Sequence, residues 1–239
     1  MMKNVLILGA SGDIGRAIAK QLADEGYQLI LHYFKNETSM RQLLEYINEE
    51  RVLQVLQADL TRDEGAKTLC ESVLYQVDGI VYVSGTAHIG LFQDTEEDIM
   101  DKMLHLHVKS PWYITQHFLH QMIQKQRGKI IFITSIWGNV GASNEVIYSS
   151  VKGAQNSFVR ALAKEVGPSG ISVNAVSPGF IDTKMNTHLE AAEKAQIISH
   201  IPLNRAGMTD DVANAVSFLM SDKSNYIQGE VMNISGGWS

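Results

Sequence analysis

The sequence predicts an α/β fold: a single doubly wound, parallel, seven-stranded sheet with helices on both faces. Three observations carry this prediction. Short apolar segments alternate along the chain with stretches in which apolar residues recur at helical spacing. The apolar segments are continuous rather than alternating, as in parallel strands that are buried on both faces. A glycine-rich turn joins the first apolar segment to the first helical stretch, as in doubly wound folds.

The first half of the chain supplies four strands and three helices. The expected strands are short apolar runs at residues 5–8, 29–31, 52–56 and 80–83. The expected helices show apolar residues three or four positions apart, within residues 14–22, 40–47 and 66–74. Gly26 follows the first of these helices and is expected to end it.

The second half continues the same alternation. The expected strands are residues 129–134, 171–176 and 230–234. The expected helices are residues 96–126, 148–166 and 210–220. Pro111 lies inside the longest of them, and because proline has no N–H, we expect it to kink that helix.

The chain shows no linker, repeat or low-complexity tract, so we expect residues 1–239 to form a single domain. The least regular stretch is residues 180–205. It follows the sixth strand, at the carboxyl edge of the sheet, where ligands bind in such folds. We interpret it as a substrate-loop insertion; the alternative is an ordinary surface connection.

Composition excludes several classes of protein. Hydrophobic residues make up 45% of the chain and charged residues 19%, which is typical of a globular protein. The net charge of −6 disfavours nucleic-acid binding. Cys70 is the single cysteine, which excludes an intrachain disulfide and a paired-thiol metal site. The apolar start is too short for a signal peptide, and no run approaches the roughly 20 apolar residues that span a bilayer. We therefore expect a cytoplasmic protein with no nucleic-acid, membrane or metal partner.

The glycine-rich turn is the first candidate site, and it reads Gly9-Ala10-Ser11-Gly12-Asp13-Ile14-Gly15. Glycine lets the backbone approach a pyrophosphate closely, and the N-terminus of the following helix presents free N–H groups and a partial positive charge. Such a turn can also be mere turn chemistry, but its place between a strand and a helix favours a dinucleotide. We therefore expect cofactor contacts from Gly9, Ser11, Asp13, Ile14 and Gly15.

The end of the second strand distinguishes the two nicotinamide dinucleotides. An acidic residue there would bind the free ribose hydroxyl of NAD(H), but residues 31–36 contain none. Lys35 could bind the 2′-phosphate of NADP(H) through charge-assisted hydrogen bonds, unless it is an ordinary solvated lysine. Asp59 and Leu60, after the third strand, could contact the adenine, or Asp59 could simply start a turn. We expect NADP(H).

Tyr148 and Lys152 lie four positions apart, and therefore on one face of the predicted helix. A nearby ammonium favours the phenolate and lowers the pKa of a tyrosine, which suits a proton donor to a carbonyl oxygen. Ser135 lies at the end of the fifth strand, where its hydroxyl could hold the same oxygen. The Tyr–Lys spacing alone is common on helix surfaces, but the serine and the glycine turn make the combination specific.

These residues resemble those of the short-chain dehydrogenase/reductase family over essentially the whole chain. The resemblance implies a Rossmann fold, NAD(P)-dependent ketone reduction, a homotetramer, and Ser135, Tyr148 and Lys152 as catalytic residues. Tyr148 and Lys152 would also contact the cofactor. The family's Pro-Gly segment matches Pro178 and Gly179, after which Ile181 would bond the nicotinamide carboxamide and Thr183 would contact the cofactor.

The chain departs from the family pattern at three places. Asp13 replaces the middle glycine of the turn. The family's Asn-Asn-Ala-Gly is Tyr82-Val83-Ser84-Gly85 here, where we expect Ser84 and Gly85 to contact the cofactor. His107 aligns with the family's catalytic asparagine. An imidazole can bridge a backbone carbonyl and a water, so His107 could serve a proton relay; the alternative is a packed core histidine.

The resemblance leaves the substrate open between two groups. The family's 3-oxoacyl-[acyl-carrier-protein] reductases often carry an arginine where this chain has Ser169, although Lys125, Arg127 and Lys129 form a basic patch. Residues 135–146 instead look like bacterial reductases of the 5-aminopentanone group on translation elongation factor P.

An aminopentanone substrate ends in a cationic amine. Glu145 could pair with that amine, and Trp137 or Trp112 could offer it an aromatic face. The alternatives are an ordinary loop carboxylate and packing aromatics. We favour the elongation factor P substrate over a carrier-bound or small ketone. A different class, a non-catalytic NADP(H) sensor, is disfavoured by the intact Ser135, Tyr148 and Lys152.

Overall fold

The computed structural model describes residues 3–187 and 189–238. Within them, seven parallel strands form one sheet in the order β3-β2-β1-β4-β5-β6-β7, which confirms the predicted fold class. The strands are β1 (Asn4–Leu8), β2 (Gln28–Tyr33), β3 (Val52–Gln57), β4 (Gly79–Tyr82), β5 (Gly128–Ile133), β6 (Ile171–Pro178) and β7 (Val231–Ile234). Each predicted strand overlaps an observed one.

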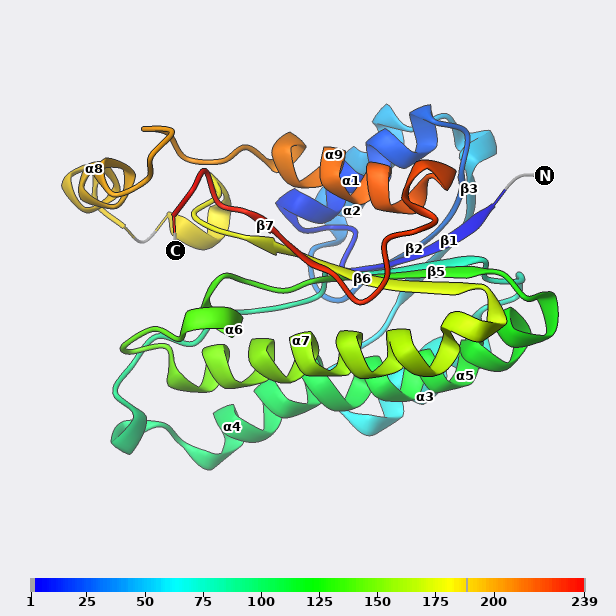
Figure 1. The fold of residues 1–239 in the computed structure, drawn as a ribbon, viewed down its shortest axis with the longest axis horizontal. Helices are drawn as coiled ribbons and strands as arrows, with labels where there is room; N and C mark the ends of the chain where they lie inside the picture. Colours follow the sequence, from blue (N-terminus) through cyan, green and yellow to red (C-terminus); the bar gives the residue numbers. More distant parts are fainter. Residues whose placement is uncertain (1–2, 188, 239) are drawn as a thin grey trace.

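Helices cover both faces of this sheet. They are α1 (Asp13–Asp24), α2 (Glu37–Tyr46), α3 (Asp63–Ser72), α4 (Glu97–Leu104), α5 (Ser110–Lys125), α6 (Trp137–Val140), α7 (Val146–Val166), α8 (Ala191–Ser199) and α9 (Thr209–Met220). α1, α2 and α9 lie on one face, and α3, α4, α5 and α7 lie on the other (Figure 1). β1 pairs with β2 on one side and β4 on the other. The strand order therefore reverses at β1, which is where doubly wound sheets open a ligand crevice at their carboxyl ends.

The core consists of two layers of apolar side chains, one on each face of the sheet. Successive residues of a strand point to opposite faces, so Val5 and Ile7 pack beneath α1 and α9 while Leu6 and Leu8 pack toward α3, α5 and α7. This explains why the strands read as continuous apolar runs. Cys70 belongs to the second layer, and its burial raises the pKa of its thiol to about 12.

The long helix predicted at residues 96–126 is interrupted by a π turn rather than by a simple proline kink. α4 runs into a π-helical segment (His105–Lys109) and then into α5. In that segment the N–H of Ser110 donates to the carbonyl of His105, five residues earlier. Pro111 lies in the first turn of α5. It has no N–H, so it cannot bond the carbonyl of His107, four residues earlier.

The predicted insertion at residues 180–205 leaves the carboxyl end of β6 and contains α8, which buries none of its residues. His188, within this stretch, lies outside the described residues. The segment is tied back to the fold by a bridge between Ile181 and Gly207. The absence of any buried residue in α8 is compatible with a substrate loop, and that role stays a prediction.

The residues that the structure describes contain neither a membrane-spanning helix nor a group of metal ligands. No helix among them is both long and apolar enough to cross a bilayer. No three or more His, Cys, Asp or Glu side chains among them are grouped to hold a metal ion.

Candidate active site

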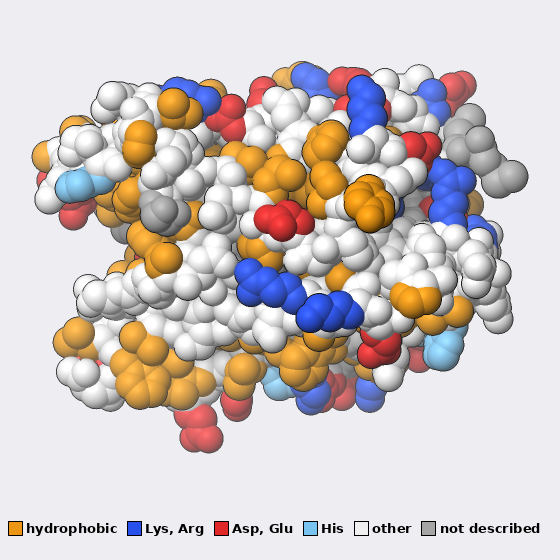
Figure 2. All heavy atoms as spheres, in the orientation of Figure 1, with side chains coloured by type: hydrophobic (Ala, Val, Ile, Leu, Met, Phe, Trp, Pro, Cys, Tyr) orange, Lys and Arg blue, Asp and Glu red, His pale blue; other side chains and the backbone are white. Residues whose placement is uncertain are grey.

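The segments predicted to form the site lie at the carboxyl edge of the sheet. Because parallel strands end at the same edge, the glycine turn after β1, Ser84 after β4 and Ser135 after β5 lie close together. α6, α8 and the C-terminal segment lie at this edge, on the left in Figure 1. The space-filling view shows this side hollowed between the lobe that carries α8 and the lobe below the sheet (Figure 2).

Ser135, Tyr148 and Lys152 come together as predicted. Tyr148 lies in the first turn of α7 and Lys152 in the next turn, with the Lys152 Nζ 5.7 Å from the centroid of the Tyr148 ring. The Ser135 hydroxyl donates a hydrogen bond that opposes the rise in the pKa of Tyr148. Ser135 is itself held by the backbone N–H of Trp137, which donates to its Oγ at 3.2 Å. The Ser135 hydroxyl therefore lies beside the Tyr148 phenol.

Burial dominates the acidity of Tyr148 in the free chain. It raises the pKa of the phenol to about 12, and the negative charge of Glu145 adds to the rise. The sequence predicts that the Lys152 ammonium lowers this pKa. In the free chain the pKa is raised instead, chiefly by desolvation. The phenol is consequently protonated at neutral pH, which is the form that can donate a proton to a ketone oxygen.

Lys152 is deeply buried, with 4% of its surface exposed, and its burial lowers the pKa of its ammonium to about 7. Its Nζ donates to the carbonyl of Ile133 at 2.8 Å and to Oε1 of Gln155 at 3.2 Å. A lysine ammonium has three donors, so one remains for a ligand beside Tyr148.

His107 lies in the π turn, where it is completely buried. Its Nε2 is 3.0 Å from the carbonyl of Thr86, and its ring meets the Tyr148 ring edge-on with centroids 5.9 Å apart. Burial and the Lys152 charge hold its pKa well below 6.5, so the imidazole is neutral. Its Nδ1 has no partner among the described residues. Gly85 is required beside it, because a Cβ there would lie 2.9 Å from the His107 Cε1. His107 is thus both packed and next to the phenol, and its relay role stays a prediction.

The glycine turn is shaped for a phosphate. Gly9 has φ +88°, and a Cβ at Gly15 would lie 2.2 Å from the Gly9 carbonyl oxygen, so both positions need glycine. Gly12 caps α1 without any side-chain hydrogen bond, which leaves the first-turn N–H groups of α1 without that partner. Nearby, the buried Ser84 Oγ has no partner among the described residues. These features fit a dinucleotide pyrophosphate.

The side chain of Asp13, at the position of the family's middle glycine, bonds a residue outside this turn. Its Oδ2 accepts a hydrogen bond at 2.7 Å from the backbone N–H of Lys184, in the 180–205 segment. Ser11 is held through its carbonyl, which accepts from the Ser39 hydroxyl at 2.7 Å. Ile14 packs against the core layer beneath α1, so its side chain anchors the turn.

His32 is a site residue that sequence reasoning missed. It lies on β2, and its Nδ1 accepts from the backbone N–H of Gly9 at 3.2 Å while its Nε2 lies 3.0 Å from the carbonyl of Ala58. A carbonyl can only accept and an N–H can only donate, so the proton is on Nε2. Burial lowers its pKa to about 4. The neutral imidazole therefore connects the glycine turn to the end of β3.

The predicted adenosine contacts have different surroundings. Lys35 is exposed after β2, with its Nζ 5.0 Å from the centroid of the Phe34 ring. Asp59 Oδ1 accepts from the backbone N–H and the hydroxyl of Thr61, at 3.0 and 2.6 Å, which is the turn-starting alternative. Leu60 is buried, and its carbonyl accepts from the Ser110 hydroxyl at 2.8 Å. Direct contact of these residues with adenine stays a prediction.

The segment predicted to contact the nicotinamide follows β6. β6 ends at Pro178, and the N–H of Gly179 donates to the carbonyl of Ile234 at 3.0 Å. Ile181 is buried, and its carbonyl accepts from the Asn186 side chain at 2.7 Å. The Thr183 hydroxyl lies 3.5 Å from the same carbonyl. These hydrogen bonds hold the segment at the same edge as Ser135.

The two predicted substrate residues flank the catalytic side chains. Trp137 begins α6, and its indole meets that of Trp238 edge-on with ring centroids 5.0 Å apart. Glu145 precedes α7, and its charge acts on the pKa of Tyr148. Contact of either side chain with a substrate stays a prediction.

Trp112, the other aromatic considered for a cationic substrate, lies elsewhere. It packs against Phe158 on α7, with ring centroids 6.1 Å apart. Phe158 is ten residues from Tyr148 along that helix, which corresponds to roughly 15 Å. The structure thus corrects the suggestion that Trp112 faces the substrate.

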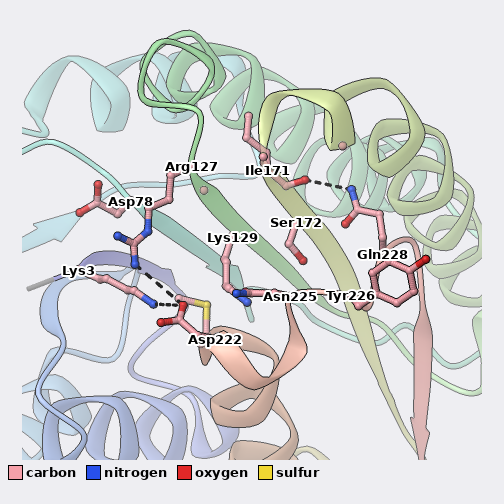
Figure 3. A pocket seen from close by; sticks show the side chains of 14 residues that line it. Lys3, Asp78, Arg127, Lys129, Ile171, Ser172, Asp222, Asn225, Tyr226 and Gln228 are labelled. Carbon is pink, nitrogen blue, oxygen red and sulfur yellow. Dashed lines mark hydrogen bonds and ion pairs between the residues drawn. The ribbon is translucent and has the colours of Figure 1, made fainter. Parts of the chain in front are cut away.

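A cavity of about 710 Å³ lies at the opposite, amino edge of the sheet, where β5 and β6 begin (Figure 3). The basic patch of Lys125, Arg127 and Lys129 is at this edge. β5 separates it from Ser135 by six residues, or roughly 20 Å of extended chain. A partner bound to this patch would not face Tyr148.

The cations of the patch also have partners. Lys3 and Arg127 share Asp222, at 2.9 and 4.0 Å, and Lys125 pairs with Asp78 at 2.6 Å. Lys129 donates to the carbonyl of Leu219, in the last turn of α9, and to the Ser221 carbonyl and Ser224 hydroxyl, which follow that helix. The cations at the amino edge are therefore engaged in ion pairs and hydrogen bonds within the fold.

Comparisons with known proteins agree with this geometry. A family model described as Enoyl-(Acyl carrier protein) reductase matches residues 9–239. The uncharacterized oxidoreductase YmfI of Bacillus subtilis is 44% identical over 100% of this chain and 99% of its own length. A 3-oxoacyl-[acyl-carrier-protein] reductase of Staphylococcus epidermidis is 34% identical over 99% of each chain. A candidate NAD(P)-dependent gluconate 5-dehydrogenase from Beutenbergia cavernae, solved with NADP bound, superposes with a TM-score of 0.93 at 27% identity, over 99% of this chain and 96% of its own.

Proposed function

The chain belongs to the short-chain dehydrogenase/reductase family of oxidoreductases, and we propose that it reduces a ketone to a secondary alcohol with NADPH. One observation carries this proposal: Ser135, Tyr148 and Lys152 meet at the carboxyl edge, beside a glycine turn whose helix N-terminus has no side-chain cap. When bound, the reduced nicotinamide supplies the hydride. Two observations favour NADP(H) over NAD(H). Residues 31–36, at the end of β2, contain no acidic residue, and Lys35 among them is exposed; the Beutenbergia relative was solved with NADP.

The protein's own residues hold the substrate and move the proton. Ser135 donates a hydrogen bond to the ketone oxygen and orients it. Tyr148, protonated at neutral pH, gives its phenolic proton to that oxygen as negative charge develops there. The Lys152 ammonium stabilises the resulting phenolate and has a donor left for the nicotinamide ribose. The His107 ring meets the phenol ring edge-on, and its Nδ1 has no partner among the described residues. We propose that this Nδ1 accepts a hydrogen bond from a water and so orients a relay that returns a proton from solvent to Tyr148.

We propose that the ketone carries a cationic amine, as in the 5-aminopentanone group on elongation factor P. The Glu145 charge acts on the phenol, and Trp137, which pairs with Trp238, is bonded through its backbone N–H to the Ser135 hydroxyl. These side chains can hold an ammonium by charge and by aromatic faces. Residues 84–104, which follow β4 at this edge, contain five carboxylates and one lysine. Such a surface attracts a cation and repels an acidic carrier protein.

The second candidate is a 3-oxoacyl-[acyl-carrier-protein] reductase. The observation that favours it is the 34% identity with the Staphylococcus epidermidis enzyme of that name over nearly the whole chain. The paired basic patch at the amino edge gives it no support, because that patch is remote from Tyr148.

Oxidation of NADPH, followed by absorbance, separates the two candidates. The purified protein is offered aminopentanone-modified elongation factor P and an acetoacetyl carrier protein side by side, and we expect turnover of the former. Glu145→Gln should raise KM for the cationic ketone at least tenfold and leave KM for the carrier substrate within twofold. Glu165→Gln, an exposed carboxylate near the other end of α7, is the matched control. Turnover of the carrier substrate alone would refute the cationic-ketone proposal and retain the reductase.

We also propose that the protein works in the cytoplasm as a homotetramer. Exposed Trp112 and Tyr113 on α5 are available for contact between copies. Light scattering after size-exclusion chromatography should give four times the mass of 26.5 kDa; a monomer would contradict this expectation.

A further inference from the structure

Gln155 lies three residues after Lys152 on α7, and only 4% of its surface is exposed. Its side-chain amide has two partners of opposite kinds. Nε2 donates to the carbonyl of His107 at 2.8 Å, and Oε1 accepts from Lys152 Nζ at 3.2 Å. An ammonium can only donate and a carbonyl can only accept, so the orientation of the amide is unambiguous.

The His107 carbonyl is available to Gln155 because of Pro111. In an uninterrupted α-helix this carbonyl would accept from the N–H of residue 111, and proline has none. The π turn at this place leaves a buried acceptor facing α7. Buried carbonyls are almost always hydrogen-bonded, and Gln155 supplies the donor. The bond therefore anchors the Gln155 amide to the backbone of the helix opposite.

Lys152 needs such an acceptor because no carboxylate faces it among the described residues. The titratable groups around it are Tyr148 on its own helix and neutral His107 on the π turn. β5 contributes only the Ile133 carbonyl. Two neutral oxygens, those of Ile133 and Gln155, are thus the acceptors that favour the ammonium over the amine in this buried position.

We infer that Gln155 is a positioning residue that keeps Lys152 charged and fixed beside Tyr148, by means of the carbonyl that Pro111 leaves unbonded. The inference rests on the proposed role of Lys152 in ketone reduction. It adds a residue that acts through Lys152 and makes no contact with substrate of its own.

The test measures the protonation of Lys152 directly, so that it does not depend on turnover. In protein labelled with ¹³Cε-lysine, the Lys152 signal, assigned by its loss in Lys152→Met, is followed by NMR from pH 5 to pH 10. Gln155→Leu removes the acceptor and should lower the midpoint by about one pH unit, a tenfold change in proton affinity. Gln155→Glu places a carboxylate beside the ammonium and should raise the midpoint. The alkaline limb of kcat/KM should move in the same two directions.

Asn156→Leu is the matched control. Asn156 is the next residue on α7, equally buried, and its amide donates to Asn139 rather than to the Lys152 site. A residue that only supports the fold would lower stability in both Leu variants and leave the midpoint unchanged. Equal midpoints in wild type, Gln155→Leu and Gln155→Glu would overturn the inference. Midpoints that move while kcat/KM keeps its pH profile would instead refute the proposed role of Lys152.

Pro111→Ala tests the same arrangement from the other side and leaves Gln155 in place. It restores an N–H that can bond the His107 carbonyl, and so releases the Gln155 amide from its anchor. We expect the Lys152 midpoint to fall, as in Gln155→Leu. A midpoint equal to that of wild type would show that Pro111 does not set the position of Gln155, and would overturn that part of the inference.

Discussion

Acidification should destabilise this protein through His32, and the size of the effect follows from its burial. The pKa of His32 is lowered from 6.5 to about 4, chiefly by desolvation. Between these values the unfolded chain binds a proton that the folded chain does not, so stability is complete above pH 6.5 and falls as the pH drops toward 4. At 1.36 kcal/mol per pKa unit the loss is about 3 kcal/mol. This is a large part of the 5–15 kcal/mol by which domains are usually stable.

The assay is urea denaturation of the free protein at pH values from 4 to 7.5, in wild type and His32→Asn. The wild-type free energy of unfolding should fall by about 3 kcal/mol more than that of the variant over this range. His120→Asn, at an exposed position on α5, is the control and should keep the wild-type slope. The buried His107 contributes equally to all three proteins. Parallel curves for wild type and His32→Asn would refute the assignment of a buried, neutral imidazole.

The remaining substitutions test the site. Tyr148→Phe should lower kcat by about 10²-fold or more, the contribution of a positioned general acid, while fluorescence titration still shows NADPH binding. Unchanged turnover would show that Tyr148 takes no part in the reaction. A wild-type protein that binds NADPH but reduces no ketone would be a sensor rather than an enzyme. Gly85→Ala should cost about 1–3 kcal/mol in urea denaturation, because its Cβ would lie 2.9 Å from the His107 Cε1; an unaltered midpoint would show that the imidazole can move away freely. Lys35→Ala should weaken NADPH about tenfold, through the loss of a charge-assisted hydrogen bond, and leave NADH unaffected; an equal loss for both would separate Lys35 from the 2′-phosphate.

The sheet was predictable because its signals are local. The strands in the middle of the sheet contain continuous apolar runs, such as Val5-Leu6-Ile7-Leu8 in β1, and burial on both faces favours that composition. The π turn at His105–Lys109 was not predictable in the same way. Pro111 indicated an irregularity, but whether a proline produces a bend or an extra residue in the turn depends on the donors packed against it, here the side chain of Gln155 on another helix.

The catalytic group was predictable for a similar reason. Tyr148 and Lys152 are one turn apart on a helix, and Ser135 follows the end of β5 by two residues, so helix spacing and the carboxyl edge of the sheet place all three. His32 and Gln155 were missed because their partners, Gly9 and His107, are 23 and 48 positions away in the sequence. The acidity of Tyr148 was misjudged because its pKa is set chiefly by burial, which local patterns do not reveal.

The buried state of Cys70 makes this chain convenient for spectroscopy. It is the only cysteine in the sequence, only 3% of its surface is exposed, and its thiol is protonated at neutral pH. The thiolate is the form that attacks a maleimide, so a maleimide dye will leave the native protein unlabelled. A cysteine introduced at exposed Ser199, at the end of α8, becomes the single reactive thiol. A fluorophore attached there follows α8 during turnover without removal of any native residue.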